Sequence, residues 1–227
     1  MTSMKPLMID IVSDVVCPWC FIGLRRIERA VARVRENHPD FQYELRWRPF
    51  FLNPDTPPEG EPYLPFLIQK FGGKDRVEAI WQRIRDAGAP LGIDYQFEKI
   101  QVRANTLQAH RLIHWAQQQG DATALVARLF SAQFEHGRNV SDLTVLAEVA
   151  ATCGYDRATV LGYLNSDKDV ALIQNMESEA RSWGVSAVPT FVFDQKASIQ
   201  GAEDPAVLAD AIEQALASTG IQPSRAL

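Results

Sequence analysis

Long apolar runs are missing from this 227-residue sequence. No stretch approaches the roughly 18 consecutive apolar residues that a membrane-spanning helix requires, so we expect no membrane contact. An excess of basic residues is missing too, because 23 Lys and Arg stand against 28 Asp and Glu and leave a net charge of −5. Affinity for nucleic acid comes largely from Lys and Arg that neutralise phosphates, so we expect no nucleic-acid partner.

Cysteine is scarce: the chain holds three, an odd number. This count excludes a small scaffold held together by several disulfides. The N-terminal residues carry one Lys and a short apolar run interrupted by Asp10, which is not the pattern of a secretory signal peptide. We therefore expect a cytoplasmic protein, a setting in which disulfides are mostly transient.

The remaining composition is that of an ordinary globular protein, with 46% hydrophobic and 22% charged residues. A chain of this length buries roughly 70% of its unfolded surface, so a core forms without covalent staples. The length fits one domain with a large insertion, or two small domains.

Two strand patterns lie near the start of the chain. Residues 7–12 form a short apolar run, and residues 41–47 alternate apolar and polar side chains, so both predict strands. Between them, apolar residues at helical spacing predict an amphipathic helix that begins at Cys17–Cys20 and ends near Glu36. A proline-rich, irregular connection follows over residues 49–61.

The middle of the chain is almost entirely helical by pattern, with glycines as punctuation. An extended piece over residues 95–102 is the one departure. The helices are expected over residues 63–72, 74–87, 104–119, 121–135, 142–152, 156–165 and 168–182.

Strand patterns return near the end, over residues 190–193 and 198–200. A last helix begins at Pro205 with Asp204 as its N-cap and runs to about Ala217. The order is β-α-β, helical block, β-β-α. We read it as one α/β domain, residues 1–60 and 183–227, interrupted by a helical insertion domain, residues 61–182.

The motif Cys17-Pro18-Trp19-Cys20 stands where the first strand gives way to the first helix. A thiolate is the nucleophilic form of cysteine, and the positive end of a helix stabilises that anion. Cys17 would occupy the helix start, and Cys20, three residues on, lies on the same helical face. We therefore predict Cys17 as the attacking thiol and Cys20 as the resolving thiol of a redox pair.

Other interpretations of the cysteines remain open. A disulfide across so short a loop adds only about 2 kcal/mol of stability, so it is a weak staple. A zinc site would need His110 and His114, which are spaced i,i+4 but lie far from the cysteines in sequence. The two thiols could also be unrelated core residues. Cys153, in an apolar helical stretch, is expected to be buried and inert.

Val188-Pro189 marks the entry to the strand over residues 190–193. Its peptide bond is either trans, as an ordinary strand entry, or cis, since X–Pro bonds adopt cis at little cost. A cis bond beside the cysteine pair would leave the backbone of Val188 free to pair with an extended peptide or with glutathione.

Five segments, spread over the chain in order, resemble a known family. They are Asp14-Val15-Val16-Cys17-Pro18-Trp19-Cys20-Phe21-Ile22-Gly23, Trp47-Arg48-Pro49-Phe50-Phe51-Leu52-Asn53-Pro54, Ala104-Asn105-Thr106-Leu107-Gln108-Ala109-His110, Gly184-Val185-Ser186-Ala187-Val188-Pro189-Thr190-Phe191 and Gly201-Ala202. The chain resembles thioredoxin-fold proteins of the DsbA-like branch, which carry a large all-helical insertion. Within that branch it resembles the FrnE-like subgroup, related to 2-hydroxychromene-2-carboxylate isomerases and kappa-class glutathione transferases.

The resemblance implies a cis Pro189 and a thiol–disulfide oxidoreductase that acts on a disulfide-containing protein or a small thiol. It implies substrate contacts from Pro18, Trp19, Val188, Pro189 and Asn105. No metal and no tightly bound cofactor are expected, although glutathione would fit as a co-substrate, and the chain would be a monomer or a homodimer. The family usually has Gly where this chain has Ala187, which would narrow access to the cysteines.

Two further functions stay open. The isomerase and transferase branch typically places Ser at the first cysteine position, so the presence of both Cys17 and Cys20 favours exchange over glutathione-dependent isomerisation of a small aromatic or polyketide-like molecule. A redox-sensing or chaperone-like binding module is the non-enzymatic alternative. The Pro-Trp pair between the cysteines carries no cation, and Asp14 would oppose the thiolate. We therefore expect a moderately stabilised Cys17 thiolate and a reductase or isomerase-like role.

Overall fold

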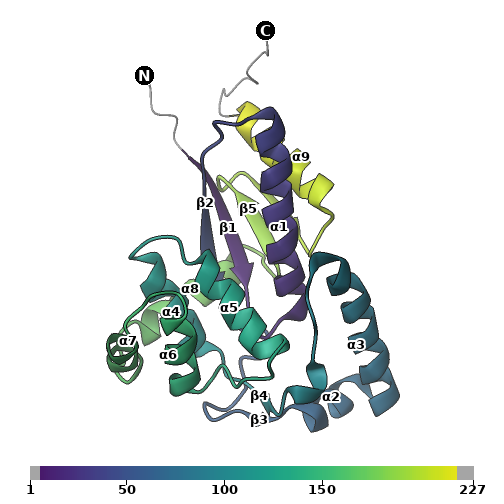
Figure 1. Cartoon of the computed structure of the whole chain (residues 1–227), viewed down its shortest axis with the longest axis vertical. Helices are drawn as coiled ribbons and strands as arrows, with labels where there is room; N and C mark the ends of the chain where they lie inside the picture. The colour runs from purple at the N-terminus through teal and green to yellow at the C-terminus, as the bar shows by residue number, and fades with distance from the viewer. Residues whose placement is uncertain (1–5, 219–227) are drawn as a thin grey trace.

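A computed structural model describes residues 6–218 of the chain. The first residues of the segment used for the signal-peptide prediction, 1–5, and the last residues, 219–227, lie outside the described part. A four-stranded sheet has the order β2-β1-β5-β6 (Figure 1). β2 runs parallel to β1, whereas β5 runs antiparallel to β1 and β6 antiparallel to β5. The strands are β1 (Leu7–Ser13), β2 (Tyr43–Pro49), β5 (Thr190–Phe193) and β6 (Ala197–Gln200).

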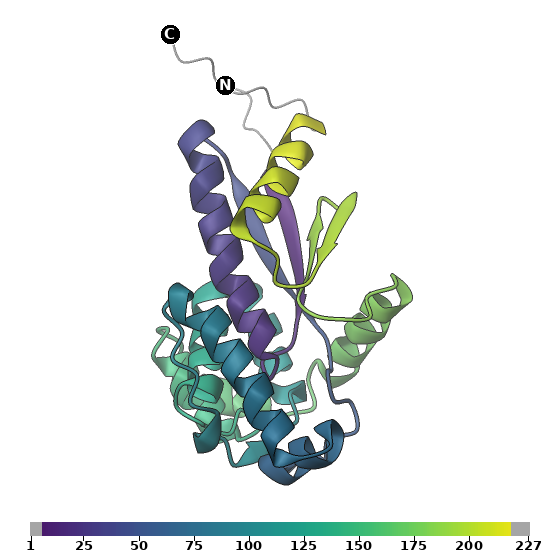
Figure 2. The same ribbon diagram turned by 90° about the vertical axis from the view of Figure 1, so that its right-hand side faces the viewer.

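Two long helices, α1 (Pro18–Asn37) and α9 (Pro205–Ser218), pack together on one side of this sheet (Figure 2). The apolar face predicted for α1 is the buried one, including Phe21, Leu24 and Ile27. The predicted cap of α9 is confirmed, because the carboxylate of Asp204 accepts a hydrogen bond from the backbone N–H of Ala206 at 2.8 Å.

A helical insertion leaves the sheet after β2 and returns before β5, and it gathers at one end of the sheet (Figure 1). α8 lies across the sheet from α1 and packs against β2 (Figure 2). The helices of the insertion are α2 (Tyr63–Phe71), α3 (Lys74–Gly88), α4 (Leu107–Gln117), α5 (Thr123–Phe134), α6 (Leu143–Ala151), α7 (Arg157–Leu164) and α8 (Val170–Ser182). In the described part of the chain, no helix combines the length and apolar character needed to cross a bilayer.

The extended piece predicted over residues 95–102 is largely wrong. The backbone turns back on itself in a short 3₁₀ helix, Phe97–Lys99, and extends only at β4 (Val102–Arg103). The physical reason is that the partner strand is short. β4 pairs with β3 (Glu61–Pro62), and α2 begins directly after β3, so no longer strand can pair there.

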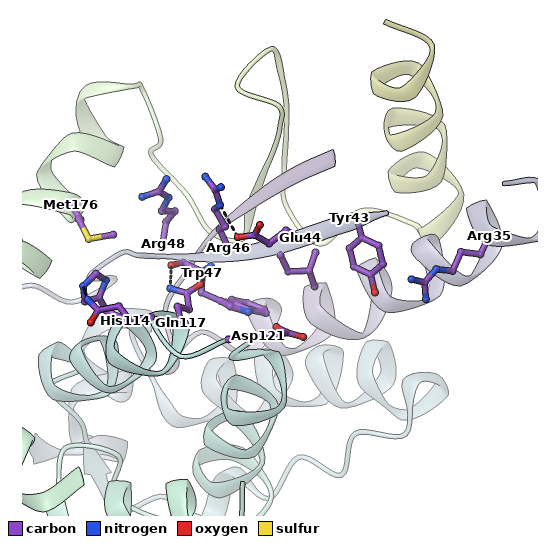
Figure 3. A pocket seen from close by; sticks show the side chains of 13 residues that line it. Arg35, Tyr43, Glu44, Arg46, Trp47, Arg48, His114, Gln117, Asp121 and Met176 are labelled. Carbon is purple, nitrogen blue, oxygen red and sulfur yellow. Dashed lines mark hydrogen bonds and ion pairs between the residues drawn. The ribbon is translucent and has the colours of Figure 1, made fainter. Parts of the chain in front are cut away.

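The side chain of Gln117, at the end of α4, joins the insertion to the edge strand β2. Its amide oxygen accepts from the backbone N–H of Trp47 at 2.6 Å, and its amide nitrogen donates to the Trp47 carbonyl at 3.1 Å (Figure 3). The amide therefore completes the edge of the sheet as a neighbouring strand would. The indole of Trp47 also donates to the hydroxyl of Thr123 at 3.3 Å.

A second link lies inside the insertion, where Arg111 of α4 is completely buried. Its guanidinium stacks over the ring of Tyr163, with 4.9 Å from the central carbon to the ring centroid. It donates to groups at and after the end of α7, where helical carbonyls lack partners. The acceptors are the carbonyls of Tyr163, Leu164, Ser166 and Lys168 and the side chain of Gln108.

Candidate active site

Cys17 occupies the N-cap position of α1, directly after the turn that follows β1. Its backbone N–H donates to the carbonyl of Asp14 at 3.0 Å, and its carbonyl accepts from the N–H of Cys20 at 3.0 Å. Pro18 at the first helical position has the φ angle that a helix requires and no N–H that would be left unbonded. β1 ends and α1 begins at the end of the sheet that faces the insertion (Figure 1). The cysteine pair therefore lies at the end of the sheet where the helices of the insertion gather.

The two thiols differ in environment. Cys17 retains 4% of its surface exposed and Cys20 only 1%, so an incoming disulfide reaches Cys17 first. Burial raises the pKa of the Cys20 thiol well above its usual value, and the hydrogen bond and the charge of Cys17 raise it further. The hydroxyl of Ser13 and the backbone at Asp14 act more weakly in the opposite direction. Cys20 is therefore held in the protonated form as long as Cys17 is not bonded to another sulfur.

The peptide bond between Val188 and Pro189 is cis, as the resemblance implied. The thiol of Cys17 lies 3.6 Å from the carbonyl oxygen of Val188, so this loop borders Cys17. The loop is seated on α1 at Gly23: a Cβ atom there would lie 2.8 Å from Cγ of Pro189 and 3.2 Å from the ring of Phe191.

We expect Gly23→Ala to destabilise the protein by about 1–3 kcal/mol, the usual cost of an added methyl group in a packed core. The intrinsic helix preference of Ala, about 1 kcal/mol, offsets part of this cost. The variant should also slow disulfide exchange, because Pro189 must move away from α1 and carry Val188 with it. Urea unfolding and the rate of exchange measure the two effects.

Gly162→Ala in α7 is the matched control, since nothing lies within 4 Å of the added atom. It should be neutral or stabilising. A Gly23→Ala protein as stable and as active as the Gly162→Ala protein would contradict the close contact between α1 and the Val188–Pro189 loop.

A buried carboxylate lies behind the cysteine pair. Asp14 is 1% exposed and His110, on α4, is 5% exposed, with 3.3 Å between the carboxylate and Nε2 of the imidazole. The other oxygen of Asp14 accepts from the backbone N–H of Leu52 at 2.8 Å, and the ring of Phe51 packs against the imidazole. Asp14 thus ties the strand-to-helix turn to the insertion, a pairing that the sequence reasoning did not predict.

Tyr95 reaches the first turn of α1 from the insertion. Its hydroxyl donates to the carbonyl of Pro18 at 2.6 Å. Burial raises the pKa of Tyr95 far above its usual range, with smaller contributions from the charges of Cys17, Cys20 and Glu135. The hydroxyl therefore stays a donor throughout the working pH range. The sequence offers no signal for this contact, because the two residues are 77 positions apart.

The remaining predicted site residues have mixed positions. Trp19 is partly buried in the first turn of α1, beside the cysteines. Asn105 uses both ends of its amide: it donates to the carbonyl of Thr56 at 2.7 Å and accepts from the N–H of Leu107 at 3.1 Å, where α4 begins. The structure therefore gives Asn105 a structural role, and its substrate contact stays a prediction.

No arrangement suited to a metal ion occurs among residues 6–218. His110 faces Asp14, and His114 contacts the side chain of Gln118, so the zinc alternative finds no support in their positions. A pocket of about 600 Å³ runs along β2 near Tyr43, Trp47 and His114 (Figure 3). None of the predicted site residues line it.

The sequence model of a protein family, the DSBA-like thioredoxin domain, matches residues 8–213 of the chain. The chain therefore belongs to this family of α/β proteins with a thioredoxin fold and a helical insertion. A curated relative, the uncharacterised protein YwbO of Bacillus subtilis strain 168, is 26% identical over 189 residues, which cover 81% of this chain and 85% of YwbO.

Solved structures of the same fold cover nearly the whole chain. A probable DsbA oxidoreductase from Streptomyces coelicolor, SCO1869, superposes with a TM-score of 0.85 at 28% identity, over 97% of this chain and 93% of its own. The fold is also that of a 2-hydroxychromene-2-carboxylate isomerase (TM-score 0.68, 15% identity, 95% of this chain and 99% of its own). The cytosolic disulfide reductase DsbM from Pseudomonas aeruginosa, solved with GSH, shares it too (TM-score 0.66, 15% identity, 92% and 99%).

Proposed function

We propose that the protein is a thiol–disulfide oxidoreductase of the FrnE-like subgroup, with Cys17 as nucleophile and Cys20 as resolving thiol. The observation that carries the proposal is the unequal thiol pair at the start of α1, one thiol slightly exposed beside Val188 and Pro189 and the other fully covered. Membership of the DSBA-like family supports the same chemistry.

The exchange has two steps. The Cys17 thiolate attacks one sulfur of a substrate disulfide, forms a mixed disulfide and releases the other sulfur as a thiolate. Cys20 then loses its proton and attacks Cys17, which releases the second substrate thiolate and leaves a Cys17–Cys20 disulfide. The substrate gains two electrons and the enzyme loses two. A reducing thiol such as glutathione returns the enzyme to the dithiol form.

The substrate is a disulfide-containing protein or a small disulfide, held beside the backbone of Val188. Pro18, Trp19 and Pro189 frame this position, and Asn105 keeps the start of α4 in place above it. The boundaries that we propose are residues 1–60 and 183–227 for the catalytic domain and residues 61–182 for the insertion. The chain works in the cytoplasm, as a monomer or a homodimer.

The reduction potential of the Cys17–Cys20 pair tests the function. Equilibration in glutathione buffers, with the disulfide detected by mass spectrometry, should give a two-electron potential between about −200 and −270 mV, as for glutaredoxins and thioredoxin. A protein carrying Cys153→Ser should give the same value, since that residue lies in the turn between α6 and α7 and outside the pair. Cys153 is partly buried there, not fully buried in a helix as the sequence predicts. If no Cys17–Cys20 disulfide forms at any buffer ratio, the proposal is wrong.

The alternative is a glutathione-dependent isomerase or transferase, which needs one hydroxyl or thiol at the helix start and no second thiol. The buried Cys20 thiol, hydrogen-bonded to Cys17, has no task in that reaction. Exchange is therefore the better supported function.

A further inference from the structure

A cation lies over the aromatic residue between the two cysteines. The central carbon of the Arg83 guanidinium, on α3, is 5.9 Å from the centroid of the Trp19 ring. α3 packs against α1 at this point, and Trp19 is partly buried against the core. The other neighbour of the cysteine pair is the carbonyl of Val188, 3.6 Å from the Cys17 thiol. The cysteine pair is thus bordered by the Val188 carbonyl and by the Trp19 ring, over which the Arg83 guanidinium lies.

Within residues 6–218, Arg83 differs from the other basic residues of α3 because its side chain has neither a carboxylate partner nor a backbone acceptor. Lys74 pairs with Glu78 at 3.5 Å, and Arg85 pairs with Glu98 at 2.5 Å. Arg76 donates to a backbone carbonyl at 3.4 Å. Arg83 is exposed, and its recorded partner is the face of Trp19. An indole face attracts a guanidinium and leaves its N–H groups available for a second partner.

Asp14, the buried acid that precedes the cysteine pair in sequence, has partners other than Arg83. Asp14 is engaged by His110 and by the N–H of Leu52. An approaching disulfide therefore meets an unpaired positive charge held by a partly fixed aromatic ring.

We propose that Arg83, seated on Trp19, is a specificity-determining residue that selects disulfides carrying a carboxylate close to the sulfur. This inference rests on the proposed function and names its substrate class: anionic disulfides, such as acidic peptides or mixed disulfides of glutathione. The guanidinium donates two hydrogen bonds to the carboxylate and so holds the substrate while Cys17 attacks. Its positive charge also raises the rate of encounter with anionic disulfides. Arg83 takes no part in the bond changes themselves.

The test uses three disulfides with the same reaction and different charge. They are dithiobis(nitrobenzoate), which carries a carboxylate on each ring, neutral dithiodipyridine and cationic cystamine. Each oxidises the reduced enzyme in a single turnover, in which the substrate takes up two electrons and the Cys17–Cys20 disulfide forms. The second-order rate constant of the first step is measured by stopped flow for the full-length protein.

For Arg83→Ala, the ratio of the anionic to the neutral rate constant should fall about three- to fivefold, the size expected for an exposed charge pair. Arg83→Glu should lower this ratio on the order of tenfold and raise the rate with cystamine. Arg83→Lys should keep most of the preference. The ratio is the readout, because any change in the reactivity of Cys17 itself acts on all three disulfides alike and cancels in it.

Arg33→Glu is the matched control, because it makes the same change in net charge on α1. Arg33 is exposed and lies 13 residues beyond Cys20, about 20 Å along the helix, where charges are largely screened at physiological salt. If Arg33→Glu and Arg83→Glu change the ratio equally, the effect is one of net charge and the inference is overturned. An unchanged ratio in every Arg83 variant also overturns it, while wild-type turnover still supports exchange. If the reduced wild-type protein reacts with none of the three disulfides, the proposed function itself fails.

Discussion

Replacement of Cys17 by serine is expected to lower the rate of disulfide exchange by on the order of a thousandfold or more, to the uncatalysed level. A serine hydroxyl does not ionise in the working pH range and forms no mixed disulfide, so the first bond of the reaction cannot form. Cys20 does not take over, because only 1% of its surface is exposed and an external disulfide does not reach its sulfur.

Replacement of Cys20 by serine should have a different result. The first step still proceeds, and the enzyme then remains attached to its substrate through Cys17, because no resolving thiol follows. Intact mass spectrometry after reaction with glutathione disulfide should show a single adduct on the Cys20→Ser protein and none on the Cys17→Ser protein. Cys153→Ser is the control and should exchange at the wild-type rate. Adduct formation on Cys20 of the Cys17→Ser protein would contradict the assigned order.

The pKa of Cys20 explains why the second step follows the first. Burial is the largest cause that raises this pKa, but the hydrogen bond that the Cys20 thiol donates to Cys17 and the negative charge of Cys17 also contribute. Both of these vanish once Cys17 is bonded to the substrate. In the proposed mechanism, we therefore expect the pKa of Cys20 to be lower in the mixed disulfide than in the free enzyme, which favours the resolving thiolate. In the free enzyme, alkylation of Cys20 should begin only well above its usual pKa of about 8.5.

Replacement of Arg111 by methionine is expected to destabilise the protein by about 3–5 kcal/mol. Methionine fills much of the same volume, but it leaves four backbone carbonyls at the end of α7 without their donor. Each unpaired buried group costs about 1–3 kcal/mol. The melting temperature of a chain of this size changes by about 2–4 °C per kcal/mol, so a decrease on the order of 10 °C is expected.

Urea unfolding of the variant, followed by circular dichroism, measures this loss. Arg128→Met on α5 is the matched control, because Arg128 is exposed and lies outside the Arg111 contacts, so its stability should change by less than about 0.5 kcal/mol. An Arg111→Met protein within about 1 kcal/mol of wild type would show that water or side chains replace the guanidinium.

The sequence was sufficient to predict most of the elements and the position of the cysteine pair at the start of the first helix. Short strands at both ends, one amphipathic helix after Cys17 and a long helical stretch gave the observed order of elements, because hydrophobic periodicity is a local property. The position of Cys17 at the helix start also follows from local pattern, since Pro18 marks the first helical residue. The family motif predicted the cis bond at Pro189, which local sequence alone left open.

Contacts between distant segments were not predictable in the same way. Asp14 and His110 are 96 residues apart, and each has ordinary local explanations, a turn residue and a core histidine. Arg111 lies in an amphipathic helix where an arginine is normally exposed, and only the path of the chain after α7 makes it a buried donor. The local pattern around Tyr95 predicts an extended piece. The sequence does not show that its partner strand, β3, is only two residues long and cannot pair with residues as far back as Tyr95.

The loop that faces Cys17 is made 171 residues after it. At the usual rate of about 5–20 residues per second, a ribosome needs roughly 10–30 s to add that stretch. During this interval the nascent chain displays its two reactive sulfurs without the Val188–Pro189 loop that will later border them. We therefore expect the sulfur of Cys17 to be more open to mispairing in the nascent chain than in the folded protein.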